Sequence, residues 1–208
     1  MAGSGDQAPV RAYLGLGANV GDARATLRDA IAALTALPGA RLRGVSRLYR
    51  TAPVGVTDQP DFLNAVVALD VPAPPGGDLA AGAIGLLVSL KDLERDFGRR
   101  HRRRWGPREL DIDLLLYGDA RLAIDRPSGG LPLSADADPA AAARLLEVPH
   151  PSMSDRLFVL APLADLAPDL VPPGWTTTVE ACRDELAARD PAAVAPIGRW
   201  VASAGDWG

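Results

Sequence analysis

Residues Arg104–Gly118 read RWGPRELDIDLLLYG, and this stretch decides the fold. Acidic and apolar residues alternate in it: one side takes Glu109, Asp111 and Asp113, and the other takes Leu110, Ile112, Leu114 and Leu116. A period of two predicts a half-buried β-strand over 109–117, with its leucine face packed on helices. Asp111 and Asp113 then share the opposite face, with Cα atoms roughly 7 Å apart.

The two aspartates favour a magnesium site. Carboxylates this close repel each other, and burial raises the pKa of at least one of them unless a cation compensates. Both side chains offer hard oxygen ligands, and no Cys or His is interleaved, which argues against zinc. Two-metal phosphoryl-transfer sites hold their ions about 3.5–4 Å apart, a gap that carboxylates can bridge. Taken alone, the pair fits a solvated strand face equally well.

A basic segment, Gly98–Arg108, lies directly upstream and holds six arginines and one tryptophan. Arginine binds phosphate oxygens bidentately, so cations beside metal-binding carboxylates are what a magnesium–polyphosphate complex requires. Without the aspartates, the same segment would fit a solvated basic loop or a nucleic-acid patch better.

The stretch 104–118 resembles the signature of the 6-hydroxymethyl-7,8-dihydropterin pyrophosphokinases, a family of folate biosynthesis. The family pattern R-W-G-P-R-x-[LI]-D-[LI]-D-[IL]-x-x-[FY]-G is matched without a break over fifteen residues. YRTAPVG, DQPDFLNAVVAL and VPHP match further family motifs. The chain departs from the family at several positions: GANVG replaces GSNLG, Ala52 replaces a proline, Phe62 replaces the usual tyrosine, and Lys91 replaces a glutamine.

Composition agrees with a small enzyme. A chain of 208 residues predicts one domain with a sizeable core. The net charge of −4 makes the arginine cluster a local feature. Cys182 is the one cysteine, which excludes an internal disulfide and suits a reducing compartment, so we expect a cytoplasmic protein. The polar start and the lack of a long apolar run predict neither a signal peptide nor a membrane span.

The order of expected elements is β-α-β-β-α-β. Strands are predicted at 11–16, 41–50, 61–71 and 109–117, and helices at 23–37 and 78–97. This order predicts an α+β, ferredoxin-like fold: an antiparallel sheet with both helices on one face and the other face free for substrates. Two later helices, a proline-broken one over 155–169 and another over 177–188, form a C-terminal helical extension.

A glycine-rich segment, Gly15–Asp22, predicts a turn between the first strand and the first helix. Its G-x-G-x-x-x-G spacing misses the dinucleotide fingerprint by one residue, and the next strand does not end in the acidic residue that would hold a ribose. There is no Walker A sequence either, so any ATP must be held in another way.

Phe62 and Asn64 are two residues apart and therefore on one face of the third strand. An aromatic ring beside an amide suits a flat heterocycle, although a core Phe and a capping Asn explain the pattern as well. The family resemblance implies a pterin pocket made by Thr51, Pro53, Val54, Phe62, Asn64, Trp105 and Phe158.

Lys91 and Glu94 are three residues apart on one helix, where a surface ion pair is the simplest interpretation. His150 lies between two prolines in an extended loop. The resemblance instead implies ATP contacts from Lys91, Glu94, Arg102, Arg104, Trp105, Arg108, Ile112, His150 and Arg156.

The resemblance implies transfer of the β,γ-diphosphate of ATP to the pterin hydroxymethyl group, with release of AMP. Asp111 and Asp113 would hold two Mg²⁺ ions, and Arg99 and Arg108 would complete the catalytic set. The alternative from another class is a ferredoxin-like module that binds RNA with its open face and its arginines.

We expect one pyrophosphokinase domain over 11–189, after a polar tail over 1–10 and before a second tail over 190–208. Residues 119–146 are expected to be an insertion loop. The expected partners are ATP and the pterin, without nucleic acid or membrane, and we expect a monomer.

Overall fold

The structure, a computed structural model, describes residues 8–53, 55, 57–98, 106–127, 143–190 and 194–208. The first half contains β1 (Val10–Ala18), α1 (Ala23–Thr35), β2 (Arg41–Val45), β3 (Leu48–Thr51), β4 (Phe62–Val71), a short 3-10 turn η1 (Pro75–Gly77) and α2 (Leu79–Asp96). The second half contains β5 (Asp111–Tyr117), β6 (Leu122–Asp125), β7 (Arg144–Val148), α4 (Leu157–Ala164), α5 (Val179–Arg189), β8 (Ala195–Gly198), β9 (Trp200–Val201) and β10 (Asp206–Trp207).

The main sheet has six strands, and all its pairings are antiparallel. Its order is β5-β1-β4-β3-β8, and β2 also pairs with β4. The predicted βαββαβ core and the α+β class are confirmed.

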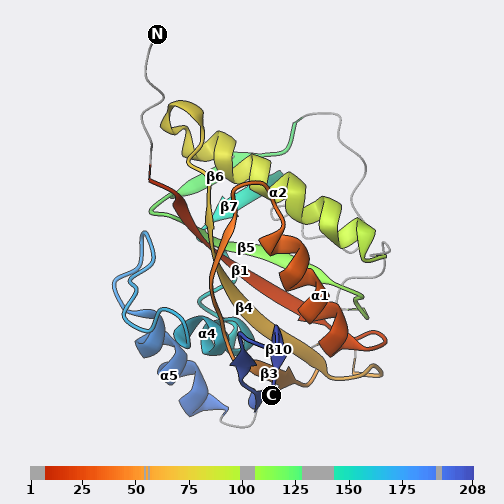
Figure 1. The fold of residues 1–208 in the computed structure, drawn as a ribbon. Coiled ribbons are helices and arrows are strands. Elements are labelled where there is room, and N and C mark those ends of the chain that lie inside the picture. Colours follow the sequence, from red (N-terminus) through yellow and green to blue (C-terminus); the bar gives the residue numbers. More distant parts are fainter. Residues whose placement is uncertain (1–7, 54, 56, 99–105, 128–142, 191–193) are drawn as a thin grey trace.

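Helices α1 and α2 cover one face of this sheet (Figure 1). Side chains at alternate positions of β1, including Leu14 and Leu16, pack there against Leu27 and Ile31 of α1 and Leu90 of α2. Both helices begin where the sequence provides an aspartate cap. Asp22 accepts a hydrogen bond from the Ala25 N–H, and Asp78 caps α2 in the same way.

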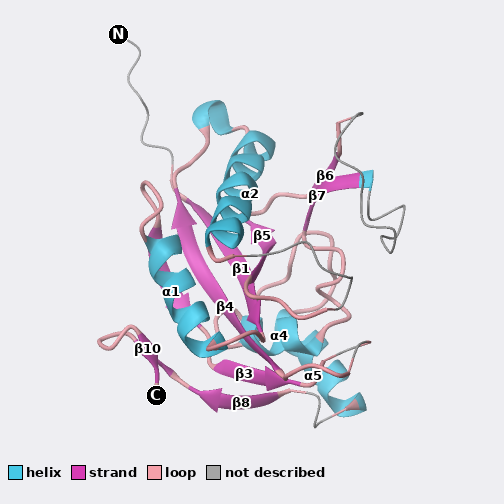
Figure 2. Ribbon diagram, turned by 90° about the vertical axis from the view of Figure 1, so that its right-hand side faces the viewer, coloured by secondary structure: helices cyan, strands magenta, loops and turns pink. Residues whose placement is uncertain are grey.

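Helices α4 and α5 lie on the opposite side of the sheet, at its β3 end (Figure 2). A second core joins Leu160 and Leu163 of α4 and Val179 of α5 to Val66 of β4. The prediction that this face is free for substrates is therefore wrong where α4 packs on β4 and β3. The apolar face of α4 needs burial, and only the part of the sheet that α4 leaves uncovered remains open.

The single strand predicted over 41–50 is two strands. Val45 of β2 lies opposite Val67, whereas Tyr49 of β3 lies opposite Asn64, so the two pair with β4 in different registers. Ser46 bridges the break: its N–H donates to the Val66 carbonyl, and its hydroxyl accepts from the Val66 N–H. A side-chain bond of this kind replaces a ladder bond and is not visible in a hydrophobic pattern.

The predicted alternation holds along β5 only as far as Leu114. Tyr13 of β1 lies opposite Leu116 but Leu14 lies opposite Leu114, so Leu115 is an extra residue in β5. Leu115 and Leu116 both reach the core beneath α4, whereas Leu114 and Tyr117 lie in the core beneath α1 and α2. The expectation that Leu116 shares a face with Leu114 is wrong because this bulge reverses the pattern.

Both segments expected to be loop or tail contain strands. In the expected insertion loop, β6 and β7 pair as a two-stranded sheet. In the expected C-terminal tail, β8 pairs with β3, and Trp207 is buried with its indole N–H donating to the Ser46 carbonyl at 2.9 Å. The domain boundaries themselves stay predictions. None of the helices among the described residues is both long and apolar enough to cross a bilayer.

Candidate active site

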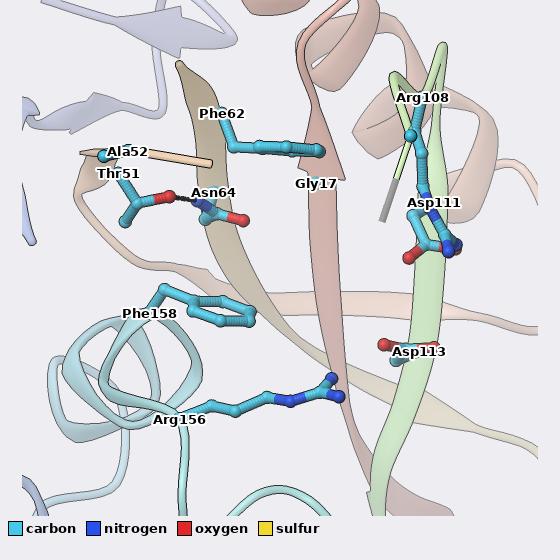
Figure 3. A pocket seen from close by; sticks show the side chains of 11 residues that line it. Gly17, Thr51, Ala52, Phe62, Asn64, Arg108, Asp111, Asp113, Arg156 and Phe158 are labelled. Atoms are coloured by element: carbon cyan, nitrogen blue, oxygen red, sulfur yellow. Dashed lines mark hydrogen bonds and ion pairs between the residues drawn. The ribbon is translucent and has the colours of Figure 1, made fainter. Parts of the chain in front are cut away.

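A cavity of about 180 Å³ opens on the sheet face that α4 leaves uncovered (Figure 3). It is lined by Gly17, Thr51, Ala52, Phe62, Asn64, Gly106, Arg108, Asp111, Asp113, Arg156 and Phe158. Strands β1, β3, β4 and β5 and the start of α4 therefore all contribute, so the pocket exists only in the folded sheet.

The floor of the cavity is the glycine-containing end of β1. Gly17 lies opposite both Asn64 on β4 and Asp111 on β5, and Gly15 lies opposite Asp113. With strands about 4.8 Å apart, the Cα atoms of Asn64 and Asp111 are about 10 Å apart across the bare backbone of Gly17. The prediction that Gly15 begins a turn is wrong, because β1 continues to Ala18.

One side of the cavity is an aromatic and amide slot. The rings of Phe62 and Phe158 project into the cavity on either side of Asn64 (Figure 3). The Asn64 side chain donates to the Thr51 hydroxyl at 2.8 Å, so its Oδ1 faces the cavity. The slot therefore offers two flat apolar surfaces and a fixed hydrogen-bond acceptor between them.

The other side of the cavity is charged. Asp111 and Asp113 share one face of β5, as predicted, and both line the cavity. Arg108 forms an ion pair with Asp111 at 2.8 Å. Arg156 directly precedes α4, and its side chain extends across the cavity toward Asp113 (Figure 3). Two cations thus accompany two carboxylates, about two strand spacings from Asn64 in the slot.

His150 does not line this cavity but lies close to its carboxylates. Its backbone N–H donates to the Leu115 carbonyl at 2.9 Å, and its Nδ1 accepts from the Ser152 N–H at 3.2 Å. Burial lowers the pKa of His150, and the negative charges of Asp113 and Asp111 oppose that shift. With Nδ1 acting as an acceptor, the neutral ring carries its proton on Nε2.

Lys91 and Glu94 lie at the outer edge of β5, outside the cavity. Glu94 is buried and accepts from the Ile112 N–H at 2.7 Å, and Lys91 donates to Glu94 at 2.7 Å and to the Ile112 carbonyl at 3.2 Å. The ion pair of the simplest sequence interpretation forms, but Glu94 is buried and not at the surface, and its carboxylate holds the backbone between the two aspartates.

The remaining predicted site residues fall in two groups. Pro53 lines a neighbouring cavity that shares Thr51, Arg156 and Phe158 with the first. Five predicted residues lie outside the part of the chain that the structure describes: Val54, Arg99, Arg102, Arg104 and Trp105. Among the cavity residues, sequence reasoning missed Gly17, Ala52 and Gly106. For Gly17, the alternation of Leu14, Leu16 and Ala18 around the glycines carried a strand signal.

The donor set suits magnesium. Asp111 and Asp113 offer only oxygen, and no third His, Cys, Asp or Glu joins them in a metal-binding group within the described residues. Mg²⁺ keeps several waters and is held by one or two carboxylates together with substrate phosphates, so two aspartates are a sufficient protein contribution.

A ferredoxin-like sheet that carries the aromatic and amide slot beside two carboxylates and two arginines defines a small-molecule phosphotransferase site. A family model, 7,8-dihydro-6-hydroxymethylpterin-pyrophosphokinase (HPPK), matches residues 13–168. The chain is 41% identical over 184 residues to a 2-amino-4-hydroxy-6-hydroxymethyldihydropteridine pyrophosphokinase of Methylorubrum extorquens, covering 88% of this chain and 96% of the relative. It is also 41% identical over 160 residues to the Pseudomonas aeruginosa enzyme of the same name, covering 77% and 82%. The chain belongs to the HPPK family.

A solved structure agrees on the fold. The wild-type Plasmodium falciparum HPPK-DHPS with pterin and p-hydroxybenzoate superimposes with a TM-score of 0.66 at 16% identity, over 94% of this chain. The chain spans 48% of that longer protein.

Proposed function

We propose that this chain transfers the diphosphate of ATP to 6-hydroxymethyl-7,8-dihydropterin, giving AMP and the pterin diphosphate, in folate biosynthesis. One observation carries the proposal: a heterocycle slot and a pair of carboxylates share one cavity. Membership of the HPPK family and the names of the two relatives support the same reaction.

The pterin would lie between Phe62 and Phe158. The Oδ1 of Asn64 would accept from the N–H groups of its pyrimidine ring, because the hydrogen bond to Thr51 already fixes the amide. Among the other residues expected here, Pro53 adjoins the slot, and Val54 and Trp105 follow from the family resemblance alone.

The ring would reach from Asn64 across the floor at Gly17, so its hydroxymethyl group would point toward Asp111 and Asp113. The length of about 10 Å between Asn64 and Asp111 suits a two-ring heterocycle with one short substituent. A shallower floor would lift the ring away from the carboxylates.

ATP would bind on the charged side, with Arg108 and Arg156 on its phosphates and His150 behind them. The Nε2–H of a neutral His150 is a suitable phosphate donor. Lys91, Glu94 and Ile112 would contact the nucleoside end. Arg99, Arg102, Arg104 and Trp105 complete the ATP set that the resemblance implies.

Asp111 and Asp113 would hold Mg²⁺, two ions as the resemblance implies. The chemistry supplied there would be that of a divalent cation, which offsets phosphate charge and lowers the pKa of the acceptor hydroxyl. Arg108 must then leave Asp111 for a phosphate oxygen, an exchange that keeps its charge paired.

In the reaction, the pterin hydroxyl oxygen bonds to the β-phosphorus of ATP and loses its proton to water. The bond from that phosphorus to the α,β-bridging oxygen breaks, and this oxygen leaves with AMP. Arg108 and Arg99 would neutralise the charge on the phosphates as AMP leaves. Orientation of two bound substrates can supply about 7–11 kcal/mol of barrier reduction, so no dedicated base is required.

The RNA-binding alternative gains nothing from the site. Asp111 and Asp113 would repel a nucleic-acid backbone on the face that such a module uses. The monomeric state and the cytoplasmic location remain proposals, the latter supported by the lone Cys182 in a chain without a possible internal disulfide.

Product analysis tests the proposal. The protein is incubated with ATP, Mg²⁺ and the pterin, and the nucleotides are separated. We expect AMP only when the pterin is present, and a loss of about a thousandfold or more in Asp111→Asn and Asp113→Asn, since each substitution removes a charged metal ligand. Formation of ADP, or unchanged turnover in both variants, would contradict the proposal.

A further inference from the structure

Asn19, directly after β1, is a buried side chain that the proposed reaction does not use. Only 3% of its surface is exposed. Its side-chain oxygen accepts from the Arg108 backbone N–H at 2.8 Å. The backbone N–H of Asn19 donates to the Arg108 carbonyl at 3.0 Å. The side-chain nitrogen of Asn19, Nδ2, donates to the Gln59 side-chain oxygen and to the Pro60 carbonyl, both at 3.0 Å.

These partners belong to opposite sides of the cavity. Arg108 is on the charged side and lies three residues before Asp111. Pro60 lies two residues before Phe62 and four before Asn64, on the slot side. A single side chain therefore joins two segments that are 40 and 89 residues away from it in sequence.

A local role does not account for these contacts. The helix that follows begins with its own cap, because Asp22 accepts from the Ala25 N–H at 3.0 Å. The acceptor and both amide hydrogens of Asn19 are all directed to residues outside its own turn. An amide is the one uncharged side-chain group that accepts on one side and donates twice on the other.

We propose that Asn19 is a positioning residue that sets the separation between the pterin slot and the phosphate-binding Arg108. The inference rests on the proposed function. Reaction requires the acceptor oxygen and the β-phosphorus at near-attack distance, and a displacement of about 1 Å can cost about 10²-fold in rate. A side chain bonded to the backbone of both segments limits such displacement.

Asn19→Asp separates the two links. One carboxylate oxygen can still accept from the Arg108 N–H, whereas the other cannot donate to Gln59 or Pro60 and repels the Pro60 carbonyl oxygen. We expect the KM for the pterin to rise about tenfold or more, with the KM for ATP changing less than about threefold. Asn19→Ala removes both links, so we expect kcat to fall about tenfold or more as well.

Asp22→Ala is the matched control, because it removes a helix cap three residues away without touching either segment. We expect it to lower the melting temperature while kcat and both KM values stay within about twofold of the parent. Gln59→Ala, on the half-buried loop side, replaces Asn19→Ala if that variant does not fold, and it should raise the pterin KM alone.

Three results would overturn the inference: an Asn19→Asp variant with a lower melting temperature but unchanged pterin KM, equal rises in both KM values, or an unchanged pterin KM in Gln59→Ala. Failure of the proposed function is distinct, since the parent protein would then form no AMP.

Discussion

At the scale of the residue, the site depends on Gly17, which has no side chain. A Cβ at Gly17 would lie 3.2 Å from the Asn64 Oδ1, the atom that we expect to accept from the pterin. The charged and aromatic residues of the site could be predicted because their chemistry is visible in the sequence. The glycine floor was not predicted, because the glycine-rich spacing was interpreted as a turn although the alternation of Leu14, Leu16 and Ala18 carries a strand signal.

Gly17→Ala should therefore weaken pterin binding by about tenfold, because the methyl group displaces the amide oxygen and covers the floor. The free energy of unfolding of Gly17→Ala should change little. Gly85→Ala in α2 is the control: no atom lies within 4 Å of its added Cβ, so it should raise stability by up to about 1 kcal/mol and leave binding unchanged. Calorimetric titration with the pterin measures the affinity of the parent protein and of each variant. An affinity of Gly17→Ala equal to that of the parent protein would contradict the role of the floor.

At the scale of the element, prediction succeeded where one side chain or one period defines a boundary. The helices predicted over 23–37 and 78–97 begin within one residue of α1 and α2, and alternation predicted most of β5. Prediction failed where an element forms only through a contact with residues distant in the sequence. The C-terminal segment looks like a tail rich in Ala and Gly, but β8 pairs with β3 and Trp207 is buried next to Ser46. Such pairing has no local sequence signal.

Trp207→Ala should accordingly lower the free energy of unfolding by about 3–5 kcal/mol, as expected for a large buried ring. Trp207→Phe keeps most of the volume but loses the hydrogen bond to the Ser46 carbonyl, so about 1–2 kcal/mol is expected. Urea unfolding followed by far-ultraviolet circular dichroism measures both. Equal losses in the two variants would contradict this division between volume and hydrogen bond.

At the scale of the whole molecule, the sequence predicts the fold class because six elements in the order βαββαβ admit few arrangements. The site needed the structure. Its outline depends on where α4 stops covering the sheet, and the packing of α4 on β4 follows from the complete set of core contacts. Resemblance to a family supplied the roles of Asp111, Asp113 and Asn64, but not the connection between them through Asn19.

The pH dependence of unfolding should reveal the two ion pairs by which Asp70 joins three strands. Asp70 of β4 lies opposite Arg11 of β1 and Arg41 of β2, and it pairs with Arg11 and with Arg43. The hydrogen bond from Arg11 lowers the pKa of Asp70, with burial opposing the shift. A carboxyl whose pKa is lower in the folded state stabilises that state above its unfolded pKa of about 3.9, and the stabilisation is lost as pH falls through the folded value.

Asp70→Asn should thus be less stable than the parent protein at pH 7, with a difference that shrinks as pH falls through the unfolded pKa of about 3.9 and vanishes below the lower folded pKa. Asp119→Asn, at an exposed turn after β5, is the control and should match the parent at every pH. Urea unfolding at several pH values compares the three proteins. A difference for Asp70→Asn that stays constant from pH 7 to below pH 3 would mean that shape and hydrogen bonding, not the charge of Asp70, hold β1, β2 and β4 together.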